Sequence, residues 1–508
     1  MATIAENLTL LKSTKAGIKA AIEAKGVSNV GDKFSDYPAK IASIEQGTVQ
    51  GKVDRVDLVQ SGWKSDDFIN NDLQTSWDNS VALAEVSKSR YENKIASEEI
   101  TVEFWTNNTK IQFFPKLSKV IQDSTSRFVD GCVNLITMPA QNYPENSTSC
   151  YSMFKGCAKL TVLEDLGTLK SSNCEQMFYG CNNLPSVPNF DTSQVTSMHS
   201  MFYDCTSLTS IPTLDTSKVT DMVSMFRGCT SLTSIPTLDT SQVTNMGYMF
   251  KGCSSLTTIP ALNTSQVTSM HSMFYGCSGL TSIPTLDTSQ VTNMDSMLRD
   301  CYNLTSIPTL DTSQVTNMSG MFYYCTSLTS IPTLDTSQVT NMSGMFRGCY
   351  NLTSIPTLDT SKVTNMDSMF SDCSRLTSIP TLDTSKVTNM GSMFSDCSSL
   401  TSIESIDFSS CTNTGYMFPS YYDYRKLTSI HVKGSISFSW TSNGFSSIPN
   451  LDFNSIKSIL EAMNRCTNPE TAKTMSFKAT MTDQDSQLTN LVSECNGKGW
   501  TITGLTIN

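Results

Sequence analysis

The chain has 508 residues, of which 16% are charged and 38% hydrophobic, and its formal net charge is −11. This acidic balance argues against nucleic acid as the main partner, because phosphate binding needs clustered positive charge. No apolar run reaches the length of a bilayer span, so we expect no membrane insertion. No nucleophile–base pair, phosphate-binding loop or carboxylate dyad stands out, so we expect neither an enzyme nor a bound cofactor or metal.

Residues 1–50 are predicted to form a separate helical module for attachment or oligomerisation. Its apolar residues follow a narrow stripe with helical spacing, and Gly26 suits a helix C-terminus. The stripe consists of Ile4, Leu8, Leu11, Ile18 and Ile22. The alternative is an ordinary amphipathic helix folded back on its own chain. Residues 51–127 are predicted to be a connector and N-terminal cap, with a helix over about 80–96 and a strand over 100–105.

An internal repeat organises residues 128–418. Eleven cysteines recur at a constant step of 24 residues, from Cys157 to Cys397. One unit, from Met225 to Tyr248, reads MFRGCTSLTSIPTLDTSQVTNMGY, and about twelve copies follow one another. Repetition at this period predicts a solenoid, in which each coil is stabilised by its neighbours.

Each coil is predicted to contain one short helix and one short strand. Met198, Met201, Phe202 and Cys205 have the i, i+3, i+4, i+7 spacing of a helix face, and a Ser, Asp or Asn residue precedes them as a cap. The LTSIP segment reads as a parallel strand of about three paired residues, ended by a proline without an N–H. The predicted fold is therefore an α/β solenoid, a leucine-rich-repeat-like, right-handed array of 24-residue coils.

Residues 419–508 are predicted to hold degenerate repeats and a C-terminal cap, because the terminal repeats of a solenoid must cover an open core. We expect helices over 451–464 and 483–495 and strands over 474–477 and 500–503.

Two polar columns follow from the repeat. The cysteines lie on the Met/Phe face, which predicts a buried, reduced column, with disulfides or metal ligation as the alternative. A second column predicts stacked carboxylates that accept hydrogen bonds in the turn D-T-S-x-V, with calcium binding as the alternative. This second column consists of Asp191, Asp215, Asp239, Asn263, Asp287, Asp311, Asp335, Asp359, Asp383 and Asp407.

The copies differ mainly at outward positions near each cysteine, where tyrosine and basic residues gather. Tyr and Arg are the residues that most often anchor interfaces. We predict a binding face there, and the alternative is drift at solvent-exposed positions. His199 and His271 share one repeat position and are interpreted as plain surface residues. The predicted face consists of Tyr203, Arg227, Tyr248, Lys251, Tyr275, Arg299, Tyr302, Tyr323, Arg347 and Tyr350.

The repeat MFxGCxSLTSIPTLDTSxVTNM resembles the BspA-type leucine-rich repeats of bacterial surface proteins. The tail, from Asn454-Ser455-Ile456 to Gly499-Trp500-Thr501, is similar to the segment that closes such arrays. This resemblance implies a parallel solenoid that binds partners.

The start of the chain resembles a different class, the tail-fibre and appendage proteins of phages that infect gut bacteria. The similar segments are IKAAIEAKGV, from Ile18 to Val27, and YPAKIASI, from Tyr37 to Ile44. The resemblance implies attachment to other virion proteins through residues 1–50, and such fibres are commonly trimeric.

We therefore expect a virion tail fibre or receptor-binding protein, assembled in the reducing host cytoplasm, that binds a host-surface glycan or protein. A structural fibre without receptor contact and a bacterial surface adhesin are the alternatives. The chain shows no recognisable signal peptide or sorting motif, which favours the virion.

Overall fold

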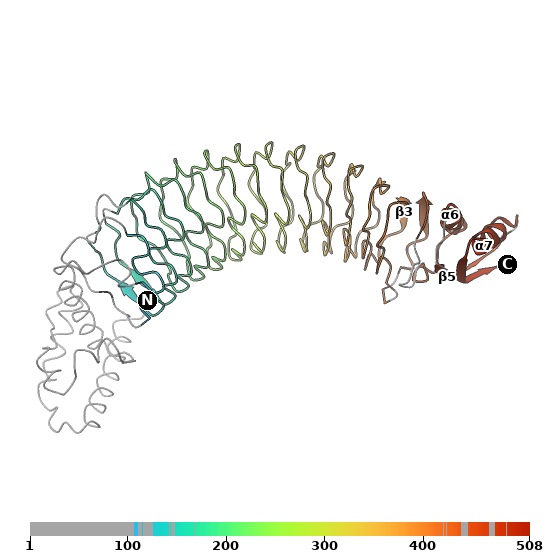
Figure 1. Ribbon diagram of the computed structural model, residues 1–508, viewed down its shortest axis with the longest axis horizontal. Helices are drawn as coiled ribbons and strands as arrows, with labels where there is room; N and C mark the ends of the chain where they lie inside the picture. Colours follow the sequence, from blue (N-terminus) through green and yellow to red (C-terminus); the bar gives the residue numbers. More distant parts are fainter. Residues whose placement is uncertain are drawn as a thin grey trace, which may run out of the picture.

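Each 24-residue repeat forms one coil, and successive coils stack in parallel into a curved solenoid (Figure 1). This arrangement confirms the predicted array. The computed structural model describes residues 106–109, 114, 125–141, 143, 148–167, 169–419, 421–422, 424–437, 445–466, 473–483 and 485–508. The predicted helical module and the elements expected between residues 80 and 105 lie outside this part of the chain.

The core is one continuous column of identical side chains. Met201, Phe202, Cys205 and Leu208 are fully buried, as are their equivalents along the array. Phenylalanine rings of successive coils stack nearly parallel, with centroids 5.4 to 5.9 Å apart. Leu298 takes the place of one ring in this stack. Because a coil has two flat apolar faces, burial is complete only between neighbours.

The predicted helix of each coil is replaced by a series of turns. In the coil around Cys205, the N–H groups of Tyr203 and Cys205 donate to carbonyls three residues earlier, at 3.2 and 3.1 Å. The N–H groups of Phe202 and Asp204, which alternate with these, donate to carbonyls of the next coil at 2.9 and 2.7 Å. Successive N–H groups therefore bond in turn within the coil and to its neighbour. In the interior of a helix, every N–H would instead bond to a carbonyl of the same helix.

Two residues per coil with left-handed backbone explain why no helix forms. Ser200 has φ 53° and Asp204 has φ 56°, and Ser224 and Gly228 take these positions one coil later with φ 57° and 78°. Each left-handed residue reorients the next peptide and interrupts a right-handed helix. Gly recurs before the cysteine because it adopts this conformation without steric cost.

The predicted three-residue strand pairing is also wrong for the proline-containing coils. Their LTSIP segments share at most one described backbone bond with a neighbour, such as Thr233 N–H to Thr209 O at 3.3 Å. The proline lacks an N–H, so the ladder stops. Parallel bridges instead join Ser197, Asp221 and Asn245, and so on along the array.

Regular strands occur near the two ends of the described array. β1 (Thr137–Met138) pairs with β2 (Val162–Leu163), and β3 (Ser402–Asp407) pairs with β4 (Ser429–Lys433), both in parallel. Glu404 stands in β3 where the preceding repeats have proline. The restored N–H is consistent with the longer strand.

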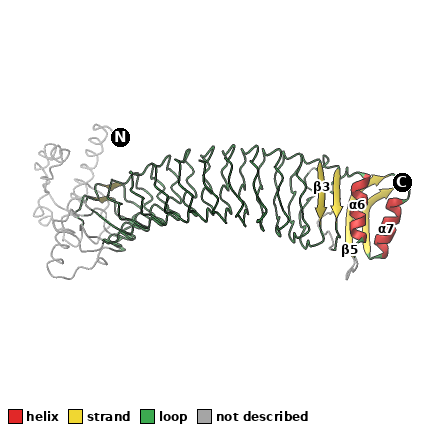
Figure 2. Cartoon of the chain, turned by 90° about the horizontal axis from the view of Figure 1, so that it is seen from above, coloured by secondary structure: helices red, strands yellow, loops and turns green. Residues whose placement is uncertain are grey.

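A different structure covers the C-terminal end, as predicted. α6 (Phe453–Asn464) is followed by β5 (Lys473–Met481), α7 (Gln487–Gly497) and β6 (Trp500–Ile507), and β5 pairs with β6 in parallel (Figure 2).

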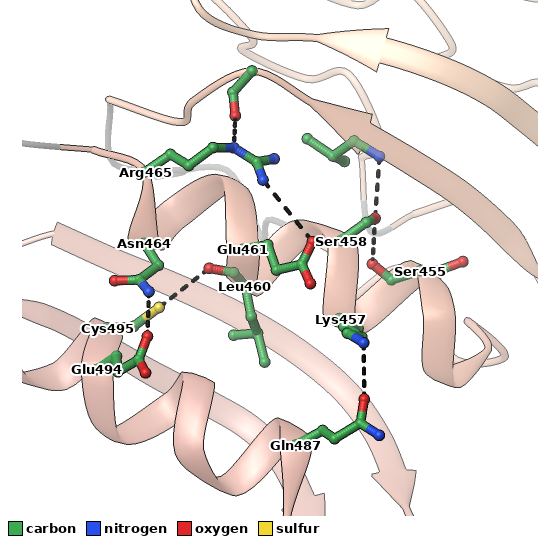
Figure 3. Close-up of polar contacts among 12 residues, drawn as sticks. Ser455, Lys457, Ser458, Leu460, Glu461, Asn464, Arg465, Gln487, Glu494 and Cys495 are labelled. Carbon is green, nitrogen blue, oxygen red and sulfur yellow. Dashed lines mark hydrogen bonds and ion pairs between the residues drawn. The ribbon is translucent and has the colours of Figure 1, made fainter.

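α6 covers the last strand of the array with two buried serines. Ser455 Oγ accepts a hydrogen bond from Ile430 N at 2.8 Å, and Ser458 Oγ accepts one from Val432 N at 3.1 Å. Figure 3 shows the two serines on α6, together with the Lys457–Gln487 bond that joins α6 to α7. Because the two serines accept hydrogen bonds from N–H groups on the outer edge of β4, the stack of coils ends without a row of unpaired backbone groups.

The cysteine column is reduced and buried. All 17 cysteines are free thiols in buried positions, and Cys205 Sγ donates to the carbonyl of Phe178 at 3.1 Å, as its equivalents do. Burial raises the pKa of the Cys253 thiol to about 12. At this position the thiolate, which is the reactive form, is therefore scarce at neutral pH.

Native thiol titration tests this column. Because every cysteine is buried, we expect almost no reaction with an aromatic disulfide reagent at pH 8 in the folded chain. In guanidinium chloride without reductant, all 17 thiols should react. A lower count after denaturation would indicate disulfides, and prompt reaction of the native chain would contradict the buried column.

Candidate binding surface

One repeat position, two residues before each cysteine, carries large side chains over nine successive coils. We call this set the Tyr/cation row, and its members are half-buried. The row consists of Lys155, Tyr179, Tyr203, Arg227, Lys251, Tyr275, Arg299, Tyr323 and Arg347. Seven of these residues belong to the predicted binding face, so the structure brings most of that prediction into one line.

Contacts between neighbours hold the row together. Cation-to-centroid distances between successive members are 4.0 to 5.4 Å, and the rings of Tyr179 and Tyr203 stack at 4.4 Å. The one break lies between Arg227 and Lys251, where two cations are neighbours. The Tyr248 ring fills this break, 5.5 Å from Arg227 and 5.4 Å from Lys251. Cation–π contacts of this kind stabilise partly exposed side chains by about 0.5–1 kcal/mol each.

Carboxylates flank parts of the row. Arg299 lies 3.7 Å from Asp300, and Arg347 lies 3.5 Å from Asp372. Partial burial raises the pKa of the Asp300 carboxyl, although the Arg299 charge opposes this shift. Desolvation likewise raises the pKa of Asp204, against the opposing effect of Arg227. The surface therefore offers hydrogen-bond donors and acceptors side by side.

The remaining two residues of the predicted face form a second line. Tyr302 and Tyr350 follow their cysteines directly and are 45% and 40% exposed. Tyr324 connects the lines, with its ring centroid 4.8 Å from that of Tyr323 and 6.2 Å from that of Tyr350.

The sequence did not predict a chain of polar contacts that runs from Tyr248 through His271 to Asp295, which we call the polar relay. His271 Nε2 lies 2.6 Å from the Tyr248 hydroxyl, and His271 Nδ1 lies 2.9 Å from Asp295 Oδ2. The relay crosses three coils, so His271 is not the plain surface residue that was expected. His199 shares the repeat position of His271, and its Nδ1 lies 3.5 Å from the carboxylate of Asp221, which belongs to a different repeat position from Asp295.

Lys155 and Tyr179 were also omitted from the predicted face. They stand 48 and 24 residues before Tyr203, so extending the 24-residue step toward the N-terminus would have included them. The polar relay has no comparable sequence signal, because it depends on the directions in which side chains of three different coils point.

The aspartate column caps turns, as the sequence predicted. Asp215 Oδ1 accepts from the backbone N–H of Ser217 at 3.1 Å and from its hydroxyl at 2.7 Å. These bonds lower the pKa of the Asp215 carboxyl. Asn263 accepts the equivalent bonds from Ser265, at 3.2 and 2.8 Å. An uncharged side chain therefore serves the same purpose, and turn capping needs no calcium.

Three further expectations concern metal binding, membrane insertion and the attachment stripe. In the described part of the chain, no group of three or more His, Cys, Asp or Glu side chains is arranged to hold a metal ion. No helix there has the length and hydrophobicity needed to cross a membrane. The attachment stripe lies before residue 106, outside the described residues, and remains a prediction.

Comparison with known proteins identifies the repeat array. The profile of the family described as "Mycoplasma protein of unknown function, DUF285" matches residues 148–260, 255–332 and 327–429, which together span more than half of the chain. No curated protein matches the sequence.

Two solved structures of bacterial proteins are similar to this chain. One is a leucine-rich repeat protein of T. pallidum, with 24% identity, 38% of this chain and 76% of that chain covered, and a TM-score of 0.24. The other is a leucine-rich repeat protein from Eubacterium ventriosum, with 16% identity, 56% and 88% covered, and a TM-score of 0.37.

Proposed function

The chain belongs to the family described as "Mycoplasma protein of unknown function, DUF285", whose match covers most of the repeat array, and we propose that it is a non-enzymatic binding protein. Its solenoid presents the Tyr/cation row and the neighbouring Tyr302 and Tyr350 to a partner on a cell surface. The observation that supports this proposal most strongly is the row itself, a line of nine large side chains on coils that otherwise vary little.

The coil does not need the row in order to fold. Ser371 and Ser395 take the same repeat position in the next two coils, and their backbone bonds are equivalent. The large side chains are therefore additions to a working coil. Partly exposed Tyr and Arg side chains with restricted motion lose little conformational freedom when a partner binds them, which favours an interface.

The proposed location is a phage virion, assembled in the host cytoplasm. Residues 1–50 would attach the chain, as a homo-oligomer and most simply a trimer, to tail or appendage proteins, and the solenoid would contact a glycan or protein of the host surface. This location is supported by the resemblance of residues 1–50 to phage appendage proteins. The family match begins at residue 148 and does not extend to that segment.

A second candidate is a bacterial surface adhesin with the same binding surface. It is favoured by the family match, whose description names Mycoplasma proteins. The two candidates differ in where the protein resides and share the binding role of the row.

Adsorption of the purified chain to cells of the source culture tests the binding role. In the triple variant Tyr275→Ser, Tyr323→Ser and Arg347→Ser, each position receives the residue that Ser371 and Ser395 already provide. We expect at least a tenfold loss of cell binding with an unchanged circular dichroism spectrum. The control Tyr416→Ser removes a tyrosine that is 60% exposed and outside the row, and should bind normally. Unchanged binding of the triple variant would refute the proposed surface.

Mass spectrometry of purified phage particles and of the cell envelope, both from the source culture, tests the location. We expect peptides such as those from residues 346–362 to be enriched in the particles. Their presence in the envelope alone would contradict the virion and favour the adhesin.

A further inference from the structure

We propose that Arg227, Lys251 and Arg299 bind the anionic groups of an acidic polysaccharide, an inference that rests on the proposed binding role of the row. The three cations stand on three of four successive coils, with Tyr275 on the coil between Lys251 and Arg299. Neighbouring coils are about 5 Å apart, so the cations span roughly 15 Å of the surface.

Arg227 and Lys251 form a repulsive pair that no carboxylate in the described part of the chain contacts directly. They are neighbours on adjacent coils, where like charges destabilise each other. Within the described residues neither forms an ion pair with a carboxylate, whereas Arg347 pairs with Asp372. Burial and the charges of Arg227 and Arg299 lower the pKa of Lys251, and the Asp300 carboxylate offsets this shift only in part. A bound anion would relieve this repulsion.

Tyr248 holds the pair in a fixed position. Its φ is 59°, a left-handed conformation that is uncommon for a large side chain, and the preceding and following coils carry serine there. His271 of the next coil lies within hydrogen-bond distance of the Tyr248 hydroxyl, and Asp295 of the coil beyond lies beside the other ring nitrogen of His271. The cations are thus arranged before a ligand arrives, which reduces the ordering cost of binding.

The groups that remain for a ligand are mostly hydrogen-bond donors. The ring faces of Tyr275 and Tyr323 already contact cations of the row, so they are poorly available for stacking on a sugar or a base. Guanidinium and ammonium groups donate to carboxylate, sulfate or phosphate oxygens. The chemistry that fits this surface is therefore an anion.

The spacing and the flanking acids favour a polysaccharide as the source of that anion. A polymer with charges at intervals along a sugar chain can reach all three cations, which a single small ion cannot. Asp204 and Asp300 flank the row and would accept hydrogen bonds from sugar hydroxyls, whereas they would repel the dense phosphates of nucleic acid.

Binding of three polymers that share one backbone tests this proposal: dextran, carboxymethyl-dextran and dextran sulfate. With the full chain immobilised, we expect both anionic polymers to bind, their affinity to fall as salt rises, and neutral dextran not to bind. The double variant Arg227→Gln and Lys251→Gln should weaken anionic binding at least tenfold.

A matched control removes the same charge elsewhere. Lys218→Gln and Lys362→Gln change two exposed lysines that bond to Gln194 and Gln338 of neighbouring coils, and glutamine is the usual residue there. This control should keep full affinity. Equal losses in the two double variants would show a net-charge effect and overturn the proposal.

Three other results would also overturn it: no binding of either anionic polymer, binding of neutral dextran with equal affinity, or tighter binding of single-stranded DNA than of the polysaccharides. These failures are distinct from failure of the proposed function. Cells that still adsorb the chain through the row would show that the surface is correct and its ligand is not an anionic polysaccharide.

Discussion

The structure depends on the alternation of backbone hydrogen bonds along the MFxGC edge of each coil. One N–H closes a turn within the coil, and the next reaches the neighbouring coil, as Tyr203 and Phe202 illustrate. This alternation gives the edge several inter-coil bonds where the proline-containing segments provide at most one. It fixes the register between coils, so equivalent side chains stack directly on one another.

That register explains both the core and the surface. Inward, it stacks the phenylalanine rings and lets the repeat cysteines donate to backbone carbonyls of the preceding coil, as Cys205 does to Phe178. Outward, it places Lys251, Tyr275 and Arg299 in one line, so that each cation meets a ring. The Tyr/cation row is therefore a product of exact repetition with substitutions at one position, and needs no change to the coil.

The sequence allowed the period, the inward residues and the C-terminal cap to be predicted, because each rests on a simple spacing. Met198, Met201, Phe202 and Cys205 were correctly placed in the core, yet their helical spacing also fits a succession of three-residue turns. The readable sign of the turns was the recurrence of Gly or Asp before most of the repeat cysteines, since both residue types tolerate left-handed backbone. The relay through His271 could not be predicted, because it depends on side-chain directions across three coils.

Hydrogen exchange of the MFxGC edges, measured by mass spectrometry on the intact chain, tests the central claim most directly. The account predicts strong and similar protection of these edges in all interior coils, because each edge has both kinds of bond. The proline-containing LTSIP segments should exchange faster. Rapid exchange of the edges, at the rate of the LTSIP segments, would show that they do not hold the coils together and would contradict the account.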